Sequence, residues 1–294
     1  MNDAVQNLPN PEQERKQRIL DEVKKELKKV RNYTPKVGVF GDTGVGKSTL
    51  CNALFGKDIA KISDVEACTR EPQEVLVGGE DGGGIILVDV PGVGEDAARH
   101  QEYIDLYKSL VPELDLVLWA IKSDDRKYMS SIDVYKEVLE PNLESCPVVF
   151  TITQSEKIEP WGGWDSVNNK PGEDQQANLQ KKINDVSSRF NVSTNKIVTI
   201  SSGQRYNLVE LVNKVVEVLP NEKKYSFTRE AKEENVSEEA AKSAEKGIFD
   251  HIKEKIGDAW DYVKDDVLDA AKDIVVEYAP KIAKKAISWL KRWF

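Results

Sequence analysis

The stretch KVGVFGDTGVGKST, from Lys36 to Thr49, decides the fold. It opens with the short apolar run KVGVF, which ends at a glycine. The residues from Gly46 to about Leu54 then follow a helical pattern. A strand that enters a glycine-rich loop and leaves it as a helix is therefore predicted here.

The loop itself, GDTGVGKST, fits the pattern G-x-x-x-x-G-K-[ST] and stands between strand and helix, as its chemistry requires. Gly41 and Gly46 let backbone N–H groups wrap around phosphates, and the helix N-terminus favours their charge. Lys47 is expected to bridge the terminal phosphates, and Ser48 to bind Mg²⁺. The sequence therefore predicts a nucleotide site formed by Gly41, Asp42, Thr43, Gly44, Val45, Gly46, Lys47, Ser48 and Thr49.

A second motif follows at ILVDVPG, from Ile86 to Gly92. It places Asp89 at the end of a buried strand, where the carboxylate can hold Mg²⁺ through water. The N–H of Gly92 can meet a γ-phosphate and so sense which nucleotide is bound. Because this motif comes about forty residues after Lys47, the two motifs support each other.

Further apolar runs alternate with helical patterns along the chain. The runs are near-continuous, as expected of central strands covered on both faces, and lie at 84–90, 115–121, 147–153 and 196–201. The helical patterns lie at 98–111, 128–140, 175–190 and 207–219. Residues 70–78 are expected to add one antiparallel strand through a glycine turn. This alternation predicts an α/β fold in three layers, with a mostly parallel six-stranded sheet between helices.

Helical segments flank this α/β region. Before it, residues 11–31 form an amphipathic helix that is expected to pack on the following domain through Ile19, Val23, Leu27 and Val30. After Pro220 only helical patterns continue, and one long helix is predicted over 247–278. Residues 161–172 are predicted to form a long surface loop. We therefore divide the chain into an N-terminal helix, an α/β domain and a C-terminal helical segment, at 1–35, 36–220 and 221–294.

The order and spacing of GDTGVGKS and DVPG resemble the Ras-related P-loop GTPases of the TRAFAC class, in particular the bacterial Era-like branch, whose members carry D-x-P-G. The amino-acid sequence of the loop is also similar to that of interferon-inducible and septin-like GTPases. The resemblance covers Lys36 to about Leu219. It implies a protein that binds GTP and GDP with Mg²⁺ and hydrolyses GTP.

The resemblance also implies the residues that would act on the γ-phosphate. Thr69 matches the family's switch threonine, with Ser63 as the weaker alternative, and would join Ser48 and Asp89 as a ligand of Mg²⁺. Such a threonine is ordered only when the triphosphate is bound. The expected catalytic residues are accordingly Lys47, Thr69 and Gly92.

Guanine is read in this family by N-K-x-D after the fifth strand, where this chain has Thr153, Gln154, Ser155 and Glu156. A glutamate can still accept two hydrogen bonds from guanine, although its side chain is one methylene longer. The family's closing motif is matched by Ser201, Ser202 and Gly203, whose backbone N–H groups could support the base carbonyl. The pair at 169–170 lies within a loop and is not the expected base reader.

No residue stands out as the group that orients the attacking water. Val93 occupies the position where Ras carries a glutamine, so slow intrinsic hydrolysis is expected. Gly44 stands where potassium-activated relatives carry an asparagine, which argues against activation of hydrolysis by potassium. The remaining candidates are Glu95, Arg99 or a residue of a partner, and the first two can equally be solvated surface charges.

Composition narrows the surroundings in which the protein acts. The formal net charge of −9 offers no positive field to nucleic acid, so nucleic-acid binding is not expected. Cys51, Cys68 and Cys146 match neither a disulfide framework nor a zinc site and are expected as buried free thiols. A cytoplasmic location is expected, because there is neither a secretory signal nor an apolar stretch of about 18 residues.

The last fourteen residues, KIAKKAISWLKRWF at 281–294, place apolar side chains on one side of a helix and five basic residues on the other. This pattern resembles a helix that lies on an anionic membrane surface. The alternative is an end helix that packs against the rest of the protein, with solvated lysines. Peripheral membrane attachment and internal packing therefore both stay open.

The leading hypothesis is a slow GTP-dependent switch whose C-terminal helices report the nucleotide state to a membrane or a protein partner. An Era-like ribosome-assembly GTPase is the second hypothesis, although nothing after Gly203 offers the G-x-x-G loop of a KH fold. A pseudo-GTPase that only binds nucleotide and an ATPase are further alternatives. The resemblance also implies a homodimer that forms across the nucleotide.

Overall fold

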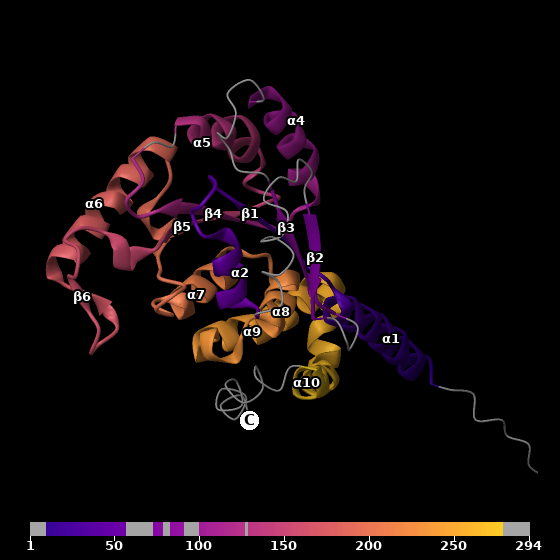
Figure 1. Cartoon of the computed structure of the whole chain (residues 1–294). Helices are drawn as coiled ribbons and strands as arrows, with labels where there is room; N and C mark the ends of the chain where they lie inside the picture. The colour runs from indigo at the N-terminus through magenta and orange to yellow at the C-terminus, as the bar shows by residue number, and fades with distance from the viewer. Residues whose placement is uncertain (1–9, 57–72, 79–82, 91–99, 127–128, 279–294) are drawn as a thin grey trace, which may run out of the picture.

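The computed structural model describes residues 10–56, 73–78, 83–90, 100–126 and 129–278. Its centre is a sheet of six strands in the order β2-β3-β1-β4-β5-β8 (Figure 1). The strands are β1 (Lys36–Phe40), β2 (Gln73–Val77), β3 (Ile85–Asp89), β4 (Leu116–Lys122), β5 (Val148–Thr153) and β8 (Ile197–Thr199). All neighbours pair in parallel except β2 and β3, which are antiparallel. The predicted six-stranded, mostly parallel sheet is confirmed.

The pairing register brings the carboxyl ends of the parallel strands together. Val39 of β1 lies beside Asp89 of β3 on one side and Leu118 of β4 on the other. Thr153 of β5 lies beside Lys122 of β4. Because parallel strands end at the same edge, the loops that leave β1, β3, β4 and β5 meet there, which is where ligands bind in open α/β sheets.

Helices cover both faces of the sheet, which confirms the three-layer arrangement (Figure 1). One face carries α1 (Pro11–Asn32), α2 (Lys47–Leu54), α7 (Leu208–Val218), α8 (Asn221–Glu230) and α9 (Glu238–Ile256). The other carries α4 (His100–Leu110), α5 (Met129–Val134), which a π-helical turn at Tyr135–Leu139 continues, and α6 (Glu173–Phe190). Single 3-10 turns lie at Val111–Glu113, Glu140–Asn142, Ser155–Lys157, Thr194–Lys196, Glu233–Asn235 and Gly257–Ala259.

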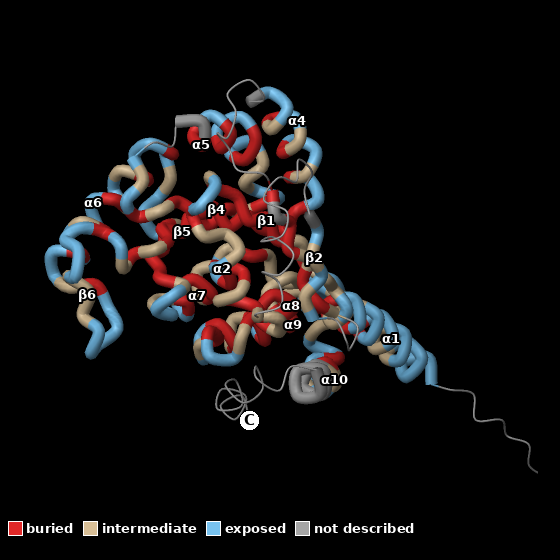
Figure 2. The backbone as a smooth tube through the Cα atoms, viewed as in Figure 1, coloured by how far each residue is buried: buried red, intermediate tan, exposed pale blue. Residues whose placement is uncertain are grey.

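Burial explains why the apolar runs form central strands. The side chains of β4 and β5 are buried on both faces, with only Lys122 partly exposed, and the buried backbone runs through the middle of the molecule (Figure 2). Trp119 of β4 is fully buried and contacts four other rings, namely Phe40, Tyr135, Phe150 and Phe190. Two free thiols, Cys51 and Cys146, are buried as expected, and burial raises the pKa of the Cys146 thiol to about 12.

The N-terminal helix is amphipathic as expected, but it packs mainly against the helices after Pro220, namely α8, α9 and α10 (Trp260–Tyr278), rather than on the α/β domain that directly follows it. Asn10 caps α1 by accepting a hydrogen bond from Glu12 N at 3.1 Å, and Pro11 occupies its first turn. The buried residues of α1 belong to the hydrophobic cluster beneath the sheet, and they are Val23, Leu27 and Val30. The spacing of four and three residues between them gives one helical stripe, on the side of α1 that contacts the helices after Pro220.

The prediction of one long helix over 247–278 is wrong. The structure has two helices there, α9 and α10 (Trp260–Tyr278), joined by the turn at Gly257–Ala259. Gly257 has φ +54°, a left-handed conformation that glycine adopts without steric cost, and its N–H bonds to Lys253 O. The apolar seam continues across the turn because Ile252 and Val263 both enter the same buried cluster.

The predicted surface loop at 161–172 contains a short antiparallel ribbon, β6 (Trp164–Asp165) and β7 (Lys170–Pro171). Asn169 Nδ2 donates to Gln204 O at 2.8 Å. The rings of Trp164 and Tyr206 meet edge to face at 5.3 Å. The segment lies on the surface as predicted, and two-residue strands are too short to leave an alternating pattern in the sequence.

The helices after Pro220 continue the core of the sheet domain. Tyr225 and Phe227 of α8 are fully buried in the same cluster as β1 and α7. Helix α10 contacts α1, and Lys16 Nζ of α1 lies 2.9 Å from Asp266 Oδ2 of α10. In the part of the chain that the structure describes, no helix combines the length and the apolar character that a membrane span requires.

Candidate functional site

The phosphate-binding loop leaves β1 and enters α2 with a backbone that two glycines make accessible. Gly41 has φ +140°, and a Cβ at this position would clash with Ala120 O of β4. Gly46 has φ +93° and is the N-cap of α2. The loop therefore lies directly on β4 and presents the N-terminus of α2, where backbone N–H groups and the helix dipole favour an anion.

Lys47 curls back over this loop. Its Nζ donates to Gly41 O at 3.0 Å and to Asp42 O at 3.3 Å. Lys47, Ser48 and Thr49 form the first turn of α2, and Lys47 and Ser48 are partly buried. A lysine held by the loop carbonyls can transfer its donors to phosphate oxygens, and the adjacent serine hydroxyl could bind a metal ion on those phosphates.

Asp42 connects the loop to α5. Ser131 Oγ donates to Asp42 Oδ1 at 2.8 Å, and Ser131 is 2% exposed. Burial raises the pKa of the Asp42 carboxyl above its usual value, while the hydrogen bond from Ser131 opposes this rise. The folded protein therefore binds this proton more tightly than the unfolded chain does.

Asp42→Asn is expected to raise the melting temperature of the nucleotide-free protein at pH 7, with no gain below about pH 4. The folded pKa lies above the unfolded one, so wild-type stability falls as pH rises through the window between them. Thermal denaturation of both proteins at pH 4 and pH 7 measures the difference. Asp105→Asn, the same change at an exposed position of α4, is the matched control. Equal melting temperatures for wild type and Asp42→Asn at pH 7 would contradict the prediction.

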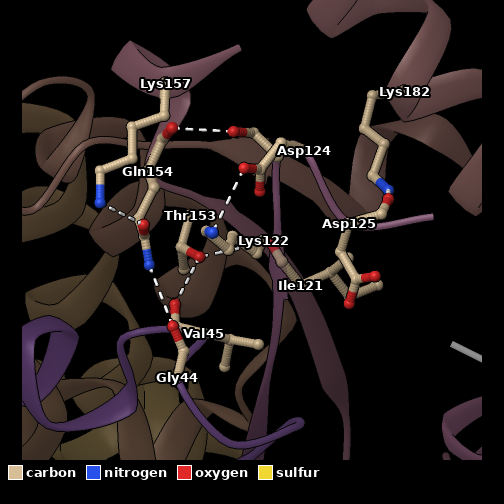
Figure 3. A network of polar contacts seen from close by, with 11 residues as sticks. Gly44, Val45, Ile121, Lys122, Asp124, Asp125, Thr153, Gln154, Lys157 and Lys182 are labelled. Atoms are coloured by element: carbon tan, nitrogen blue, oxygen red, sulfur yellow. Dashed lines mark hydrogen bonds and ion pairs between the residues drawn. The ribbon is translucent and has the colours of Figure 1, made fainter. Parts of the chain in front are cut away.

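The end of β5 is hydrogen-bonded to the same loop (Figure 3). Thr153 Oγ1 donates to Val45 O at 2.6 Å, and Gln154 Nε2 donates to Gly44 O at 3.2 Å. Lys157 Nζ in turn donates to Gln154 Oε1 at 2.8 Å. These bonds join two segments that lie more than a hundred positions apart in the chain, so the candidate phosphate and base sites form one unit.

Glu156 follows in the 3-10 turn at Ser155–Lys157. Its Oε2 is buried and has no hydrogen-bond partner among the described residues, and the same holds for Ser202 Oγ. A buried carboxylate oxygen without a donor costs about 1–3 kcal/mol or more, so such an atom calls for a ligand that donates. The N1–H and exocyclic amine of guanine are donors of this kind, and the turn therefore fits guanine.

The third segment of the site, which contains Ser201, Ser202 and Gly203, forms a hydrogen-bonded turn next to the Ser155–Lys157 turn. Ser155 N donates to Ile200 O at 3.0 Å, which brings the ends of β5 and β8 together. Ser201 and Tyr206 exchange two backbone hydrogen bonds, of 2.9 and 3.2 Å, and Gln204 N donates to Ser201 Oγ at 3.1 Å. Ser202 and Gly203 lie at the tip of this closed turn, where their backbone N–H groups could support a base carbonyl.

Several predicted site residues lie outside the described residues, namely Ser63, Thr69, Gly92, Val93, Glu95 and Arg99. Asp89 is described as the last residue of β3, in register with Val39 of β1. The structure thus brings together the segments that carry the loop residues, Asp89, Thr153, Gln154, Glu156 and the Ser201–Gly203 turn.

Sequence analysis missed three side chains that hold the site. Ser131 binds Asp42, Ser123 Oγ donates to Gln154 O at 2.8 Å, and Gln175 Nε2 donates to Ile158 O at 2.8 Å. None belongs to a motif, and each contacts a segment remote in sequence. The only sequence feature they share is a polar residue next to a buried strand or on an otherwise apolar helix face, which is too common to single them out.

Comparison with known proteins agrees with this geometry. A family model described as "50S ribosome-binding GTPase" matches residues 36–154. The protein YkfA of Escherichia coli (strain K12) is 37% identical over 204 residues, which cover 69% of this chain and 69% of YkfA. GTPase Era of Clostridium kluyveri is 24% identical over 190 residues, which cover 64% of this chain and 57% of Era.

A crystal structure of Era from Aquifex aeolicus bound to GDP and AlF4⁻ is similar with a TM-score of 0.45 and 23% identity. That similarity covers 64% of this chain and 57% of the Era chain, so the chain spans little more than half the length of Era. The family model covers β1 to the end of β5, which includes the phosphate-binding loop, Asp89 and Thr153. The chain belongs to the P-loop GTPases, in one family with YkfA.

Proposed function

We propose that this protein binds GDP and GTP together with Mg²⁺ and hydrolyses GTP slowly, as a molecular switch. The observation that carries the proposal is Glu156 Oε2, which is buried and has no hydrogen-bond partner within the described part of the chain, just beyond a strand end that is hydrogen-bonded to the phosphate-binding loop. A glycine-rich loop alone would suit any nucleoside triphosphate. The carboxylate adds a group that accepts from guanine and that the acceptor N1 of adenine does not match.

Each site residue has a defined part in this proposal. Lys47 and the backbone N–H groups of the loop hold the phosphates, and Gly92 N–H contacts the γ-phosphate. Ser48, Asp89 and Thr69 would hold Mg²⁺, which would supply charge neutralisation on the phosphates. Val93 offers no polar group to the attacking water, which is why hydrolysis is proposed to be slow without a partner or self-association.

Calorimetric titration of the wild-type chain with GDP, a non-hydrolysable GTP analogue and ADP tests the nucleotide class. We expect micromolar affinity for the guanine nucleotides with Mg²⁺ present and much weaker binding of ADP. Release of phosphate from GTP, followed over hours, measures turnover. Preference for adenine nucleotides or absence of binding would overturn the proposal, and binding without any turnover would make the protein a pseudo-GTPase.

The switch part of the proposal is supported by a contact between α8 and the β2–β3 hairpin. Glu230 Oε1 accepts from Gly84 N at 3.2 Å, and a Cβ at Gly78 would clash with Glu230 Oε2. Arg229 donates to Glu230 Oε1 at 2.6 Å and also to Arg31 O at the end of α1. The strands of this hairpin lead to the Thr69 and Gly92 segments, so a change at the γ-phosphate has a path to the helices.

Glu230→Ala is expected to uncouple the helices from the nucleotide. In the wild type, hydrogen exchange in α8 and α10 should differ between the GDP-bound and the GTP-analogue-bound protein by about fivefold or more in rate, since coupling energies are typically about 1–3 kcal/mol. In Glu230→Ala this difference should disappear, because Gly84 N loses its acceptor on α8. Mass spectrometry of the exchanged peptides provides the measurement.

Glu234→Ala serves as the matched control for this variant. Its side chain is 56% exposed and pairs only loosely with Arg205, at 3.8 Å, so the nucleotide-dependent difference should persist. Identical exchange of the helices in both nucleotide states of the wild type would argue against a switch that acts through α8.

The location and the partners also belong to the proposal. We also propose a cytoplasmic location and attachment to anionic membranes through the basic, amphipathic sequence pattern of residues 281–294, which lie outside the described residues. Flotation of the chain with anionic and with neutral vesicles distinguishes this attachment from internal packing. A nucleotide-dependent homodimer is also proposed, and light scattering with GDP and with the GTP analogue tests it.

A second candidate function is a role on the ribosome, which the description of the matching family favours. This function would require binding to ribosomal particles in one nucleotide state. Co-sedimentation with 50S subunits, with GDP or with the GTP analogue present, separates the two candidates. Recovery of the protein with 50S subunits only when the analogue is bound would favour the ribosomal role.

A further inference from the structure

Gln175 lies in the first turn of α6 and is completely buried. Its Nε2 lies 3.3 Å from Glu156 O, 2.8 Å from Ile158 O and 3.2 Å from Pro160 O, so its two N–H bonds are shared among these three acceptors. One side chain therefore holds three carbonyl groups of the segment that begins at Glu156. None of the residues at the position of the guanine-reading motif, Thr153, Gln154, Ser155 and Glu156, makes these bonds.

The chemistry of this contact fixes which group must be there. Three carbonyl oxygens surround the side-chain end, so only a donor with several N–H bonds can satisfy them, and an amide nitrogen is such a donor. The orientation leaves Gln175 Oε1 buried without a hydrogen-bond partner among the described residues. A buried acceptor in that state is costly, so the orientation of the amide is set by the two N–H bonds that it shares among the three carbonyl groups.

Neighbouring bonds hold the same segment along its length. Asn178 Nδ2, one turn further along α6, donates to Glu159 O at 2.8 Å. Gly163 N donates to Pro160 O at 3.0 Å, and Gly163 packs so closely on Gln175 that a side chain there would press on the amide. Helix α6 thus holds the segment that begins at Glu156, while Gln154, directly before that segment's start, contacts the phosphate-binding loop.

We propose that Gln175 is a positioning residue for guanine recognition. By fixing the backbone from Glu156 to Pro160, it holds the Glu156 carboxylate where that group can bind the exocyclic amine of guanine. A glutamate has one more rotatable bond than an aspartate and loses more conformational freedom when it binds, so a rigid backbone beneath it matters more. This inference rests on the proposed function.

Gln175→Met tests the inference, because methionine keeps the length and volume and removes the donors. The probes are GDP and IDP, which differ only in the exocyclic amine of the base. In the wild type, GDP should bind about tenfold or more tightly than IDP, as expected for one hydrogen bond to a charged group. In Gln175→Met the ratio should fall to about two or less, with weaker GDP binding as its main cause.

The matched control is Gln176→Met, the same change at the exposed neighbouring position of α6. It should leave the ratio of GDP to IDP affinity unchanged. A second comparison uses Glu156→Ala alone and combined with Gln175→Met. If Gln175 acts through Glu156, the ratio in the double variant should equal that in Glu156→Ala, because the two effects are then not additive.

Asn178→Ala keeps the inference testable if Gln175→Met does not fold. It loosens the same segment through one exposed bond and should lower the ratio about twofold. A folded Gln175→Met with the wild-type ratio, or a wild type that binds GDP and IDP equally, would overturn the inference and leave the GTPase proposal standing. A wild type that binds neither GDP nor IDP would instead overturn the proposed function.

Discussion

Replacing Lys47 with alanine is expected to lower the affinity for GDP and for a GTP analogue by about two to four orders of magnitude. Lys47 Nζ bonds to Gly41 O and Asp42 O, and these donors would pass to phosphate oxygens when a nucleotide binds. Hydrogen bonds to charged groups contribute about 1.5–3 kcal/mol each, and every 1.4 kcal/mol is a factor of about ten in affinity. Two lost bonds therefore give the stated range, and titration calorimetry measures it.

The control for this variant is Lys108→Ala on α4. Lys108 is an exposed lysine that pairs with Glu137 at 2.7 Å on the surface, and its removal should leave nucleotide binding unchanged. The melting temperature of nucleotide-free Lys47→Ala should stay close to that of the wild type, since the lost bonds are local. An affinity within about threefold of the wild type would show that phosphates do not bind at this loop.

The strands and the order of the layers could be predicted because each central strand is a local signal. Residues 116–122 and 148–153 are continuous apolar runs, and both faces of these strands are buried. The antiparallel β2 was predicted from the glycine turn that precedes β3, and it does pair with β3 over Gln73–Val77. Near-continuous runs separated by helical patterns leave few other arrangements.

The C-terminal helices could not be predicted as well, because their break depends on one backbone conformation. The apolar spacing continues through Gly257, so periodicity alone extends one helix across it. The left-handed φ of Gly257 turns the chain instead, and Phe249 of α9 and Val267 of α10 then enter the same cluster. Glycine inside a helical pattern permits such a turn without requiring it.

The residues of the candidate site also differ in whether the sequence could predict them. The phosphate-binding loop and the turn at Glu156 are contiguous in sequence, so their residues could be named in advance. Gln175 reaches Glu156 O from 19 positions away, and Glu230 reaches Gly84 from 146 positions away. Contacts of this kind depend on how the helices pack on the sheet, which a single sequence does not reveal.

Asp115→Ala is expected to produce the largest loss of stability, about 3–5 kcal/mol, because it breaks a buried charged contact. Asp115 directly precedes β4 and is 6% exposed. It accepts from Tyr33 OH at 2.6 Å and from Lys36 N at 2.8 Å, and it pairs with Lys223 Nζ at 2.6 Å. The variant would leave all three donors without this acceptor, in a region where water has little access.

The three donors of this contact come from three parts of the chain, namely the end of α1, the start of β1 and α8. Asp115→Ala should therefore lower the urea midpoint by about 1–2 M, with one transition for sheet and helices if they unfold together. Glu113→Ala is the control, because Glu113 is 60% exposed, pairs with Lys36 Nζ at 2.9 Å and should cost less than about 1 kcal/mol. A separate early transition of the helices in Asp115→Ala would show that Asp115 joins them to the GTPase domain, whereas an unchanged midpoint would contradict its structural role.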